Sequence, residues 1–282
     1  MAYQHTLEYQ NYKEMLMIDR FIDLPPHVQA LLSTLFTWAV TALGAALVFV
    51  FKKVSRTVMD AMLGFAAGVM IAASFWSLLS PAIEMAEKVG LNPWLTVLMG
   101  FMFGGGLLFA GDRFFSAFER KRQNEQKGSM KRCLMLVSSI TLHNIPEGMA
   151  VGVAFASAAY GLEGATLAAA GLLALGIGLQ NFPEGTAVSV PLRREGMSRG
   201  KAFFFGQLSG LAEPIAGVAG AILVLHMRML LPYLLAFAAG AMIYVVVEEL
   251  IPESQTNEKK DVMALFTLIG FSVMMVLDVA LG

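Results

Sequence analysis

The chain has 282 residues, of which 57% are apolar and 15% are charged, and its mean hydropathy is +0.65. Soluble globular domains carry about 25% charged residues, so this composition excludes an ordinary soluble domain and indicates a polytopic membrane protein. The net charge of −1 identifies no partner, and the single cysteine, Cys133, excludes a disulfide framework and a cysteine-rich metal site.

The first segment of the chain, residues 1–25, is polar and mixed, without the basic and apolar regions of a cleavable signal peptide. We predict that residues 1–28 form an extracytoplasmic N-terminal segment. Residues 29–282 are expected to form one transmembrane domain, whose first helix acts as its own insertion signal.

Eight apolar runs follow, and each is near the roughly 20 residues that a helix needs to cross a bilayer core. The predicted fold class is therefore an all-α integral membrane protein with eight transmembrane helices. The expected helices are 29–51, 58–80, 91–111, 133–158, 162–190, 202–225, 229–250 and 262–281. The longest polar separator is a basic loop at about 112–132.

The basic residues indicate the orientation in the membrane. Of the twenty Lys and Arg residues, all lie on alternate connecting segments except Lys13, Arg20, Lys88 and Arg228. Because Lys and Arg concentrate in cytoplasmic loops, we assign the basic side to the cytoplasm and place both termini outside. The basic loop at 112–132 is interpreted as an orientation signal, so no nucleic-acid partner is expected.

The fourth and fifth runs contain the same phrase, "LHNIPEGMAVGV" at 142–153 and "LQNFPEGTAVSV" at 179–190. The phrase puts Glu147 and Glu184 near the middle of the membrane. A charged side chain there costs about 2.5–3.5 kcal/mol even on insertion scales. The predicted spans contain no Lys or Arg to pair with these glutamates, so protons or a bound cation must compensate them.

The spacing within the phrases favours a cation. His143 and Glu147 are four residues apart and share one helix face, and Gln180 and Glu184 repeat this geometry. The polar residue next in each phrase is an asparagine, Asn144 or Asn181. A proline before each glutamate frees a backbone carbonyl, which is tolerated in a membrane where the helix lines a polar cavity.

A further intramembrane carboxylate, Glu213, follows in the sixth run within "GQLSGLAEP". Carboxylates together with an imidazole suit divalent first-row metals, and zinc is a good match. Three or more carboxylates would allow two ions, with Glu147 and Glu184 bridging them.

The remaining polar and sulfur-containing residues have simpler interpretations on pattern alone. They are assigned to packing or to helix ends, except that Glu248 and Glu249 also suit an ion exit. These residues are Met70 (core packing), Gln207 (an interhelix hydrogen bond), His226, Asp112 and Asp278 (helix ends), and Glu248 and Glu249 (an interfacial pair).

"HNIPEG", "QNFPEG" and "GQLSGLAEP" in successive spans resemble the ZIP (zinc/iron-regulated transporter-like) metal transporters, particularly the bacterial GufA-like group. The resemblance covers nearly the whole chain. It implies a 3+2+3 helix bundle in which the first and last three helices are related by an inverted repeat. It also implies import of zinc, or of related ions such as cadmium or iron, across the bacterial inner membrane. Divalent ions and the lipid bilayer are the expected partners, and a homodimer is left open.

The resemblance also implies a set of site residues. The first metal position matches Met70, His143, Glu147, Gln180 and Glu184, and the second matches Asn144, Glu147, Asn181, Glu184 and Glu213. An outer entrance matches Ser77 and Glu84, and a cytoplasmic exit matches Glu249 beside Glu248. The chain departs from the family pattern at Asn181, where some relatives have an acid, and at Gln180, where many have histidine.

These observations predict a carrier and not an enzyme. The expected mechanism is alternating access around the mid-membrane site, with protons replacing the released metal. A metal-selective channel with the same site and a proton-coupled solute transporter remain alternatives. An intramembrane metalloprotease would need H-E-x-x-H, and "HNIPE" lacks the second histidine.

Overall fold

The computed structural model of the chain describes residues 20–51, 55–121, 128–161, 165–194, 196–226, 228–256 and 258–281, and every regular element there is helical. These residues form eight long helical stretches, some of which contain a short π- or 3-10-helical segment. The stretches are α2 and α3 (Pro26–Ala45, Leu47–Val50), α4, η1 and α5 (Arg56–Ala73, Ser74–Leu79, Ser80–Lys88), α6 (Pro93–Lys121), α7 (Gly128–Ala159), α8 (Leu167–Arg194), α9 and α10 (Arg199–Gly210, Ala212–His226), η2, α11, η3 and α12 (Arg228–Leu230, Leu231–Val245, Val246–Leu250, Ile251–Ser254) and α13 (Lys260–Leu281).

Six of these stretches within the described residues are long and apolar enough to cross a membrane. The prediction of an all-α membrane protein is therefore confirmed. The other two stretches, α7 and α8, contain the repeated phrase, and each has proline inside the helix. The prediction of eight spans in a 3+2+3 arrangement stays a prediction.

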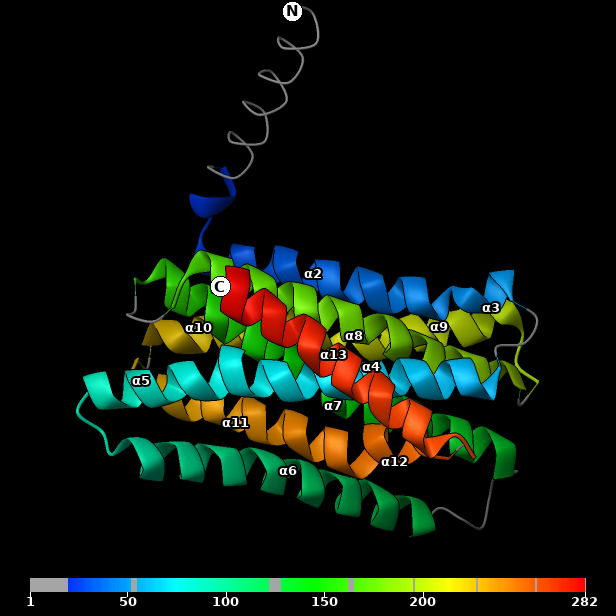
Figure 1. The fold of residues 1–282 in the computed structure, drawn as a ribbon. Helices are drawn as coiled ribbons and strands as arrows, with labels where there is room; N and C mark the ends of the chain where they lie inside the picture. Colours follow the sequence, from blue (N-terminus) through cyan, green and yellow to red (C-terminus); the bar gives the residue numbers. More distant parts are fainter. Residues whose placement is uncertain are drawn as a thin grey trace, which may run out of the picture.

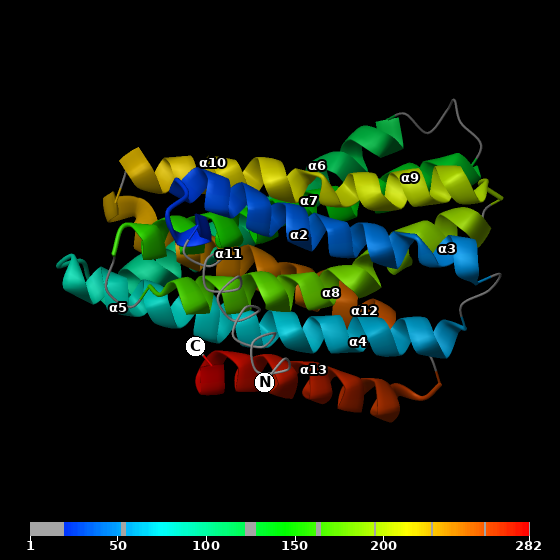
Figure 2. The same cartoon turned by 90° about the horizontal axis from the view of Figure 1, so that it is seen from above.

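The helices lie side by side and run lengthwise along one bundle (Figures 1 and 2). The bundle end where α4, α9 and α13 begin carries exposed basic side chains and is called the basic end below. Its basic residues include Arg56, Arg194, Arg199, Lys259 and Lys260. Helix α2 starts at the opposite end, and α13 finishes there (Figure 1).

The outer surfaces of α6 and α13 are strongly apolar. Trp94 and Phe103 on α6 are each 67% exposed, and Leu265 and Leu268 on α13 are more than half exposed. Large apolar side chains gathered on a helix surface need an apolar solvent, which the hydrocarbon core of a bilayer provides. These two helices therefore present a lipid-facing surface.

Four helix pairs make the most extensive contacts, namely α2 with α8, α7 with α10, α4 with α13, and α6 with α11. In each pair a glycine lies directly against the partner's backbone, where a Cβ atom would collide with a carbonyl oxygen. These contacts include Gly185 with Thr41, Gly148 with Glu213, Gly68 with Thr267, and Gly104 with Phe237. Close backbone approach through small residues is a common basis of helix association in membranes.

Two stretches change to a π-helix near one end, at η1 and at η3. A proline follows each π segment, Pro81 in α5 and Pro252 in α12. Proline cannot donate its backbone hydrogen bond, so the preceding turn is free to widen. The widened turns carry Ser77 at one end of the bundle and the Glu248–Glu249 pair toward the basic end.

Within the basic segment expected as a loop at 112–132, the residues that the structure describes are helical. Helix α6 continues to Lys121, and α7 begins at Gly128. Residues 112–121 contain neither glycine nor proline, so nothing in their backbone chemistry stops the helix at the edge of the apolar run.

We expect Gly104→Ala to lower the free energy of unfolding by about 1–3 kcal/mol, because the new methyl group would collide with the Phe237 carbonyl. Thermal unfolding of purified protein in detergent measures this loss. Gly106→Ala is the matched control, two residues along the same helix, because nothing lies within 4 Å of its added Cβ. Equal unfolding temperatures for the two variants would contradict the packing described here.

Candidate metal centre

Helices α7 and α8 bring the two copies of the repeated phrase together inside the bundle. The two helices run antiparallel and contact each other. All six polar residues named in the phrases are buried, with exposed fractions between 0% and 5%. They are His143, Asn144 and Glu147 on α7, and Gln180, Asn181 and Glu184 on α8. The predicted polar site in the interior is therefore present as a group of buried side chains.

One direct hydrogen bond joins the two copies. The Gln180 Nε2 donates to Glu147 Oε1 over 2.7 Å. The second carboxylate oxygen of Glu147, Oε2, is buried without a hydrogen-bond partner. The hydrogen bond from Gln180 therefore satisfies only one of the two carboxylate oxygens of Glu147.

Other atoms of the two phrases also lack partners. Both polar atoms of the Asn144 side chain are buried without a hydrogen bond, as are Gln180 Oε1 and Asn181 Oδ1. An unsatisfied buried polar atom costs about 1–3 kcal/mol, so a concentration of such atoms marks a place where a further group fits. Most of them are oxygens, and amide and carboxylate oxygens bind cations.

The sixth-run carboxylate, Glu213 on α10, has several partners. Asn181 Nδ2 lies 2.9 Å from each of its carboxylate oxygens. The Thr37 hydroxyl on α2 contacts Oε2, and the Thr41 hydroxyl lies 3.4 Å from Oε1. The predicted proximity of Asn181 and Glu213 is present, but hydrogen-bond donors surround the carboxylate.

A large cavity opens at the basic end of the bundle, with a volume of about 970 Å³. His143 and Glu184 from the phrases line it together with Glu248 and Glu249. His143 Nδ1 lies 3.0 Å from Glu249 Oε2, so the predicted exit residue contacts a predicted metal ligand directly.

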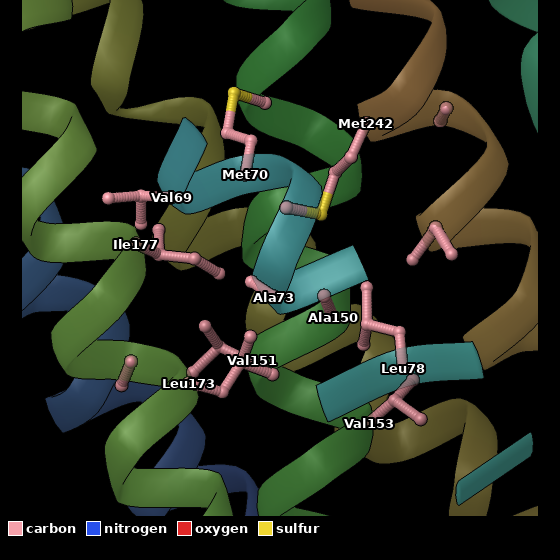
Figure 3. Close-up of a cluster of buried hydrophobic side chains, with 14 of the residues drawn as sticks. Val69, Met70, Ala73, Leu78, Ala150, Val151, Val153, Leu173, Ile177 and Met242 are labelled. Atoms are coloured by element: carbon pink, nitrogen blue, oxygen red, sulfur yellow. The ribbon is translucent and has the colours of Figure 1, made fainter. Parts of the chain in front are cut away.

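Met70 lies in a different environment, an apolar layer deeper in the bundle (Figure 3). It is fully buried and packs with side chains of α4, α7, α8 and α11. The labelled members of this layer are Val69, Met70, Ala73, Leu78, Ala150, Val151, Val153, Leu173, Ile177 and Met242. Along α4, the layer residues Val69, Met70 and Ala73 follow Leu63, which lines the cavity at the basic end.

A second, smaller cavity of about 200 Å³ lies beyond this layer. It is lined by both predicted entrance residues, Ser77 and Glu84, and by Asp278. The Ser77 hydroxyl donates to Asp278 Oδ1 over 2.7 Å. The interpretation of Asp278 as a helix-end residue alone was therefore incomplete.

The described residues contain no group of three or more His, Cys, Asp or Glu side chains close enough to hold a metal ion. The predicted ligands have other partners. Glu249 contacts His143 at the cavity wall, while Thr37, Thr41 and Asn181 contact Glu213. The predicted ligands are thus neighbours that do not form a closed coordination shell in this conformation.

The sequence reasoning missed the threonines of α2. Thr34, Thr37 and Thr41 are all buried, and two of them contact Glu213. Their spacing of three and four residues puts them on one helix face, and this spacing alone could have indicated a buried polar face on α2. No comparable signal linked Asp278 to Ser77, because 201 residues separate the two.

A sequence model of the ZIP zinc transporter family matches residues 119–278, more than half of the chain. The chain belongs to the ZIP family. Zinc transporter ZIP11 of Xenopus tropicalis is 41% identical to this ZIP protein, in an alignment covering 94% of this chain and 100% of the relative. Zinc transporter ZIPB of Bordetella bronchiseptica is 38% identical (87% and 79% covered), and zinc transporter GufA of Myxococcus xanthus is 35% identical (89% and 98% covered).

Membership of the ZIP family confirms the resemblance and the prediction of a transporter. The relatives are named zinc transporters and not enzymes, so the metalloprotease alternative is set aside. This ZIP protein is a multi-pass membrane protein that transports metal ions. Its ligand set, its direction of transport and its number of bound ions are proposals, argued below.

Ala150 and Ala187 occupy the same position in the two phrases but different environments. Ala187 lines the cavity at the basic end, and Ala150 is 0% exposed in the apolar layer. In a Cys133→Ser background, we expect Ala187→Cys to react rapidly with a membrane-impermeant maleimide applied at the basic end. Ala150→Cys is the matched control and should react at least about tenfold more slowly, because its side chain is buried in the apolar layer. A tenfold difference in rate corresponds to about 1.4 kcal/mol in the free energy of exposing the thiol. Equal labelling rates would contradict the cavity assignment.

Proposed function

We propose that this ZIP protein imports zinc into the cytoplasm across the cell membrane through a site between α7 and α8. One observation carries the proposal: Glu147 and Glu184 are buried in the two phrases beside oxygens that have no hydrogen-bond partner. No basic side chain in the predicted spans can neutralise these carboxylates. A divalent cation would neutralise both and use the free oxygens.

The proposed ligands are His143 and Glu147 on α7, Gln180 and Glu184 on α8, and Met70 on α4. Two carboxylates, one imidazole and weaker amide and thioether donors suit a zinc ion that must later leave. Gln180 would turn its oxygen toward the ion, since its amide nitrogen now donates to Glu147. His143 would leave Glu249 to bind the ion and return as the ion exits.

Two routes to this site are proposed from the cavities. The cavity at the basic end provides the exit, with Glu248 and Glu249 on its wall. The smaller cavity with Ser77, Glu84 and Asp278 provides the entrance, and the apolar layer lies between the two cavities. A route that is open at one end and interrupted by an apolar layer favours a carrier over an open channel. In the proposed orientation, this conformation faces the cytoplasm.

The glycine contacts support movement of two rigid groups of helices. Backbone contacts at glycine occur within the group α2, α7, α8 and α10, and within the group α4, α6, α11 and α13. Between the groups, a Cβ on Gly176 of α8 would meet only side chains, chiefly the flexible thioether of Met274. Close backbone contacts resist sliding, whereas side chains can repack. Alternating access would therefore move the first group against the second.

The same pairings support the proposed 3+2+3 inverted repeat. The repeat exchanges the stretch of α2 with that of α10, α4 with α11, α6 with α13, and α7 with α8. Under this exchange, the pair α2 and α8 becomes α10 and α7, and the pair α4 and α13 becomes α11 and α6. All four are the most extensive helix pairs of the described residues. The two π segments, η1 and η3, also exchange places.

Glu147→Ala is expected to reduce zinc uptake into proteoliposomes at least about 100-fold, a loss of about 2.7 kcal/mol for one charged ligand. Radioactive zinc uptake measures the effect. Glu87→Ala is the control, because Glu87 is an exposed acid of α5 outside both cavities. Uptake by Glu147→Ala at the rate of the control would refute the proposed site.

His143→Gln would make the two phrases alike at their second position. We expect the ratio of zinc to manganese uptake to fall about tenfold, because an imidazole favours zinc and an amide oxygen suits manganese. Competition between the two ions in proteoliposomes measures the ratio. Gln180→His is the reciprocal variant and should raise it, and an unchanged ratio in both would exclude this position from metal selection.

A further inference from the structure

The hydrogen bonds around Glu213 are those of a satisfied acceptor. Thr37, Thr41 and Asn181 contact its two carboxylate oxygens, and Glu213 is 0% exposed. Neither of its oxygens is among the buried atoms without a partner, in contrast to Glu147 Oε2. A carboxylate with this many donors is stabilised without a bound cation.

Asn181 faces Glu213 with its amide nitrogen. The same nitrogen lies 3.2 Å from the Thr37 backbone carbonyl, so its two hydrogens serve one carbonyl and one carboxylate. The opposite orientation would put the Asn181 oxygen against both of these acceptors. An asparagine that directs its N–H donors at Glu213 offers no oxygen to a metal ion placed between the two side chains.

The backbone around this network is also tightly packed. Gly148 of α7 lies against the Glu213 backbone, and Gly185 of α8 lies against the Thr41 carbonyl. A Cβ on Gly210 would lie 3.1 Å from the Thr41 side chain. Helices α2, α7, α8 and α10 therefore meet around one carboxylate, which leaves little room for an ion and its water.

The side chains around Glu147 differ in their hydrogen bonding. Both polar atoms of Asn144, one carboxylate oxygen of Glu147 and the amide oxygen of Gln180 have no hydrogen-bond partner. Beside Glu213, the amide oxygen of Asn181 also lacks a partner, but both carboxylate oxygens of Glu213 have one. The two carboxylates therefore differ, because Glu147 keeps an unpaired oxygen and Glu213 does not.

We propose that Glu213 is a positioning residue that fastens α2 to α8 and α10, and that the site between α7 and α8 holds a single divalent cation. Asn181 is the residue that excludes a second ion, because its amide supplies donors where a carboxylate would supply a bridging ligand. The proposal rests on the ion site proposed above and adds the number of ions bound per chain.

Zinc stoichiometry of the purified full-length chain tests the proposal. Metal-free protein is equilibrated with saturating radioactive zinc, and the bound ions are counted for wild type, Glu213→Gln and Glu147→Ala. Glutamine keeps the size of Glu213 and an acceptor oxygen for Asn181, so Glu213→Gln should bind as many ions as wild type. Glu147→Ala should bind one ion fewer, and ions held elsewhere on the chain cancel in both comparisons.

Loss of one ion in Glu213→Gln would overturn the proposal and leave the ion site at Glu147 intact. Equal stoichiometry for wild type and Glu147→Ala would instead contradict the proposed ion site itself. The single-ion proposal would then fail with it.

A gain-of-binding variant provides a second test that does not depend on a loss. Asn181→Asp puts a carboxylate against Glu213, and the repulsion between them is relieved by a bound cation. We expect this variant to bind one zinc ion more than wild type and to unfold at a lower temperature than wild type when metal is absent. The double variant Asn181→Asp, Glu213→Gln should lose the extra ion. A wild-type stoichiometry for Asn181→Asp would count against the role assigned to Asn181.

Discussion

The cost of burying a negative charge in a membrane governs the interior of this protein. Glu147, Glu184 and Glu213 are all buried, and the spans supply no lysine or arginine to pair with them. The structure meets this constraint in two ways. Around Glu213 it supplies threonine and asparagine donors, and around Glu147 it leaves oxygens without partners. The same type of residue is therefore a structural acceptor in one place and a candidate ion ligand in another.

Close packing at glycine determines how those carboxylates can be brought together. Gly148 and Gly185 occupy the same position in the two phrases, directly after the glutamates, and each admits the backbone of a different helix. Gly148 receives α10 and Gly185 receives α2, so each phrase is fixed to its own partner helix. Between these fixed helices, Gln180 of α8 donates a hydrogen bond to Glu147 of α7. Glycine thus places the charged groups, although it contributes no chemistry to the site.

Much of this arrangement was predictable, because it depends on local patterns. The apolar runs gave the helices, and the phrases gave the six polar residues that the structure buries on α7 and α8. The contacts between distant elements were not predictable in the same way. Thr37 and Glu213 are 176 residues apart, and the contact between His143 and Glu249 depends on how α7 meets the widened turn η3. A single sequence carries the periodicity of each helix, but it does not carry the rotation of one helix against another.

The repeated phrase also has a consequence for the conformations open to this fold. On α8, Ala187 in the phrase lines the cavity at the basic end. On α7, its counterpart Ala150 is packed in the apolar layer instead. Equivalent positions of two similar sequences in inverted orientation thus occupy an open and a closed environment at the same time. Under the proposed inverted repeat, exchanging these two environments generates a conformation that opens at the other end of the bundle. The environment of each copy in this conformation is then the one that the other copy would have in the conformation open at the opposite end.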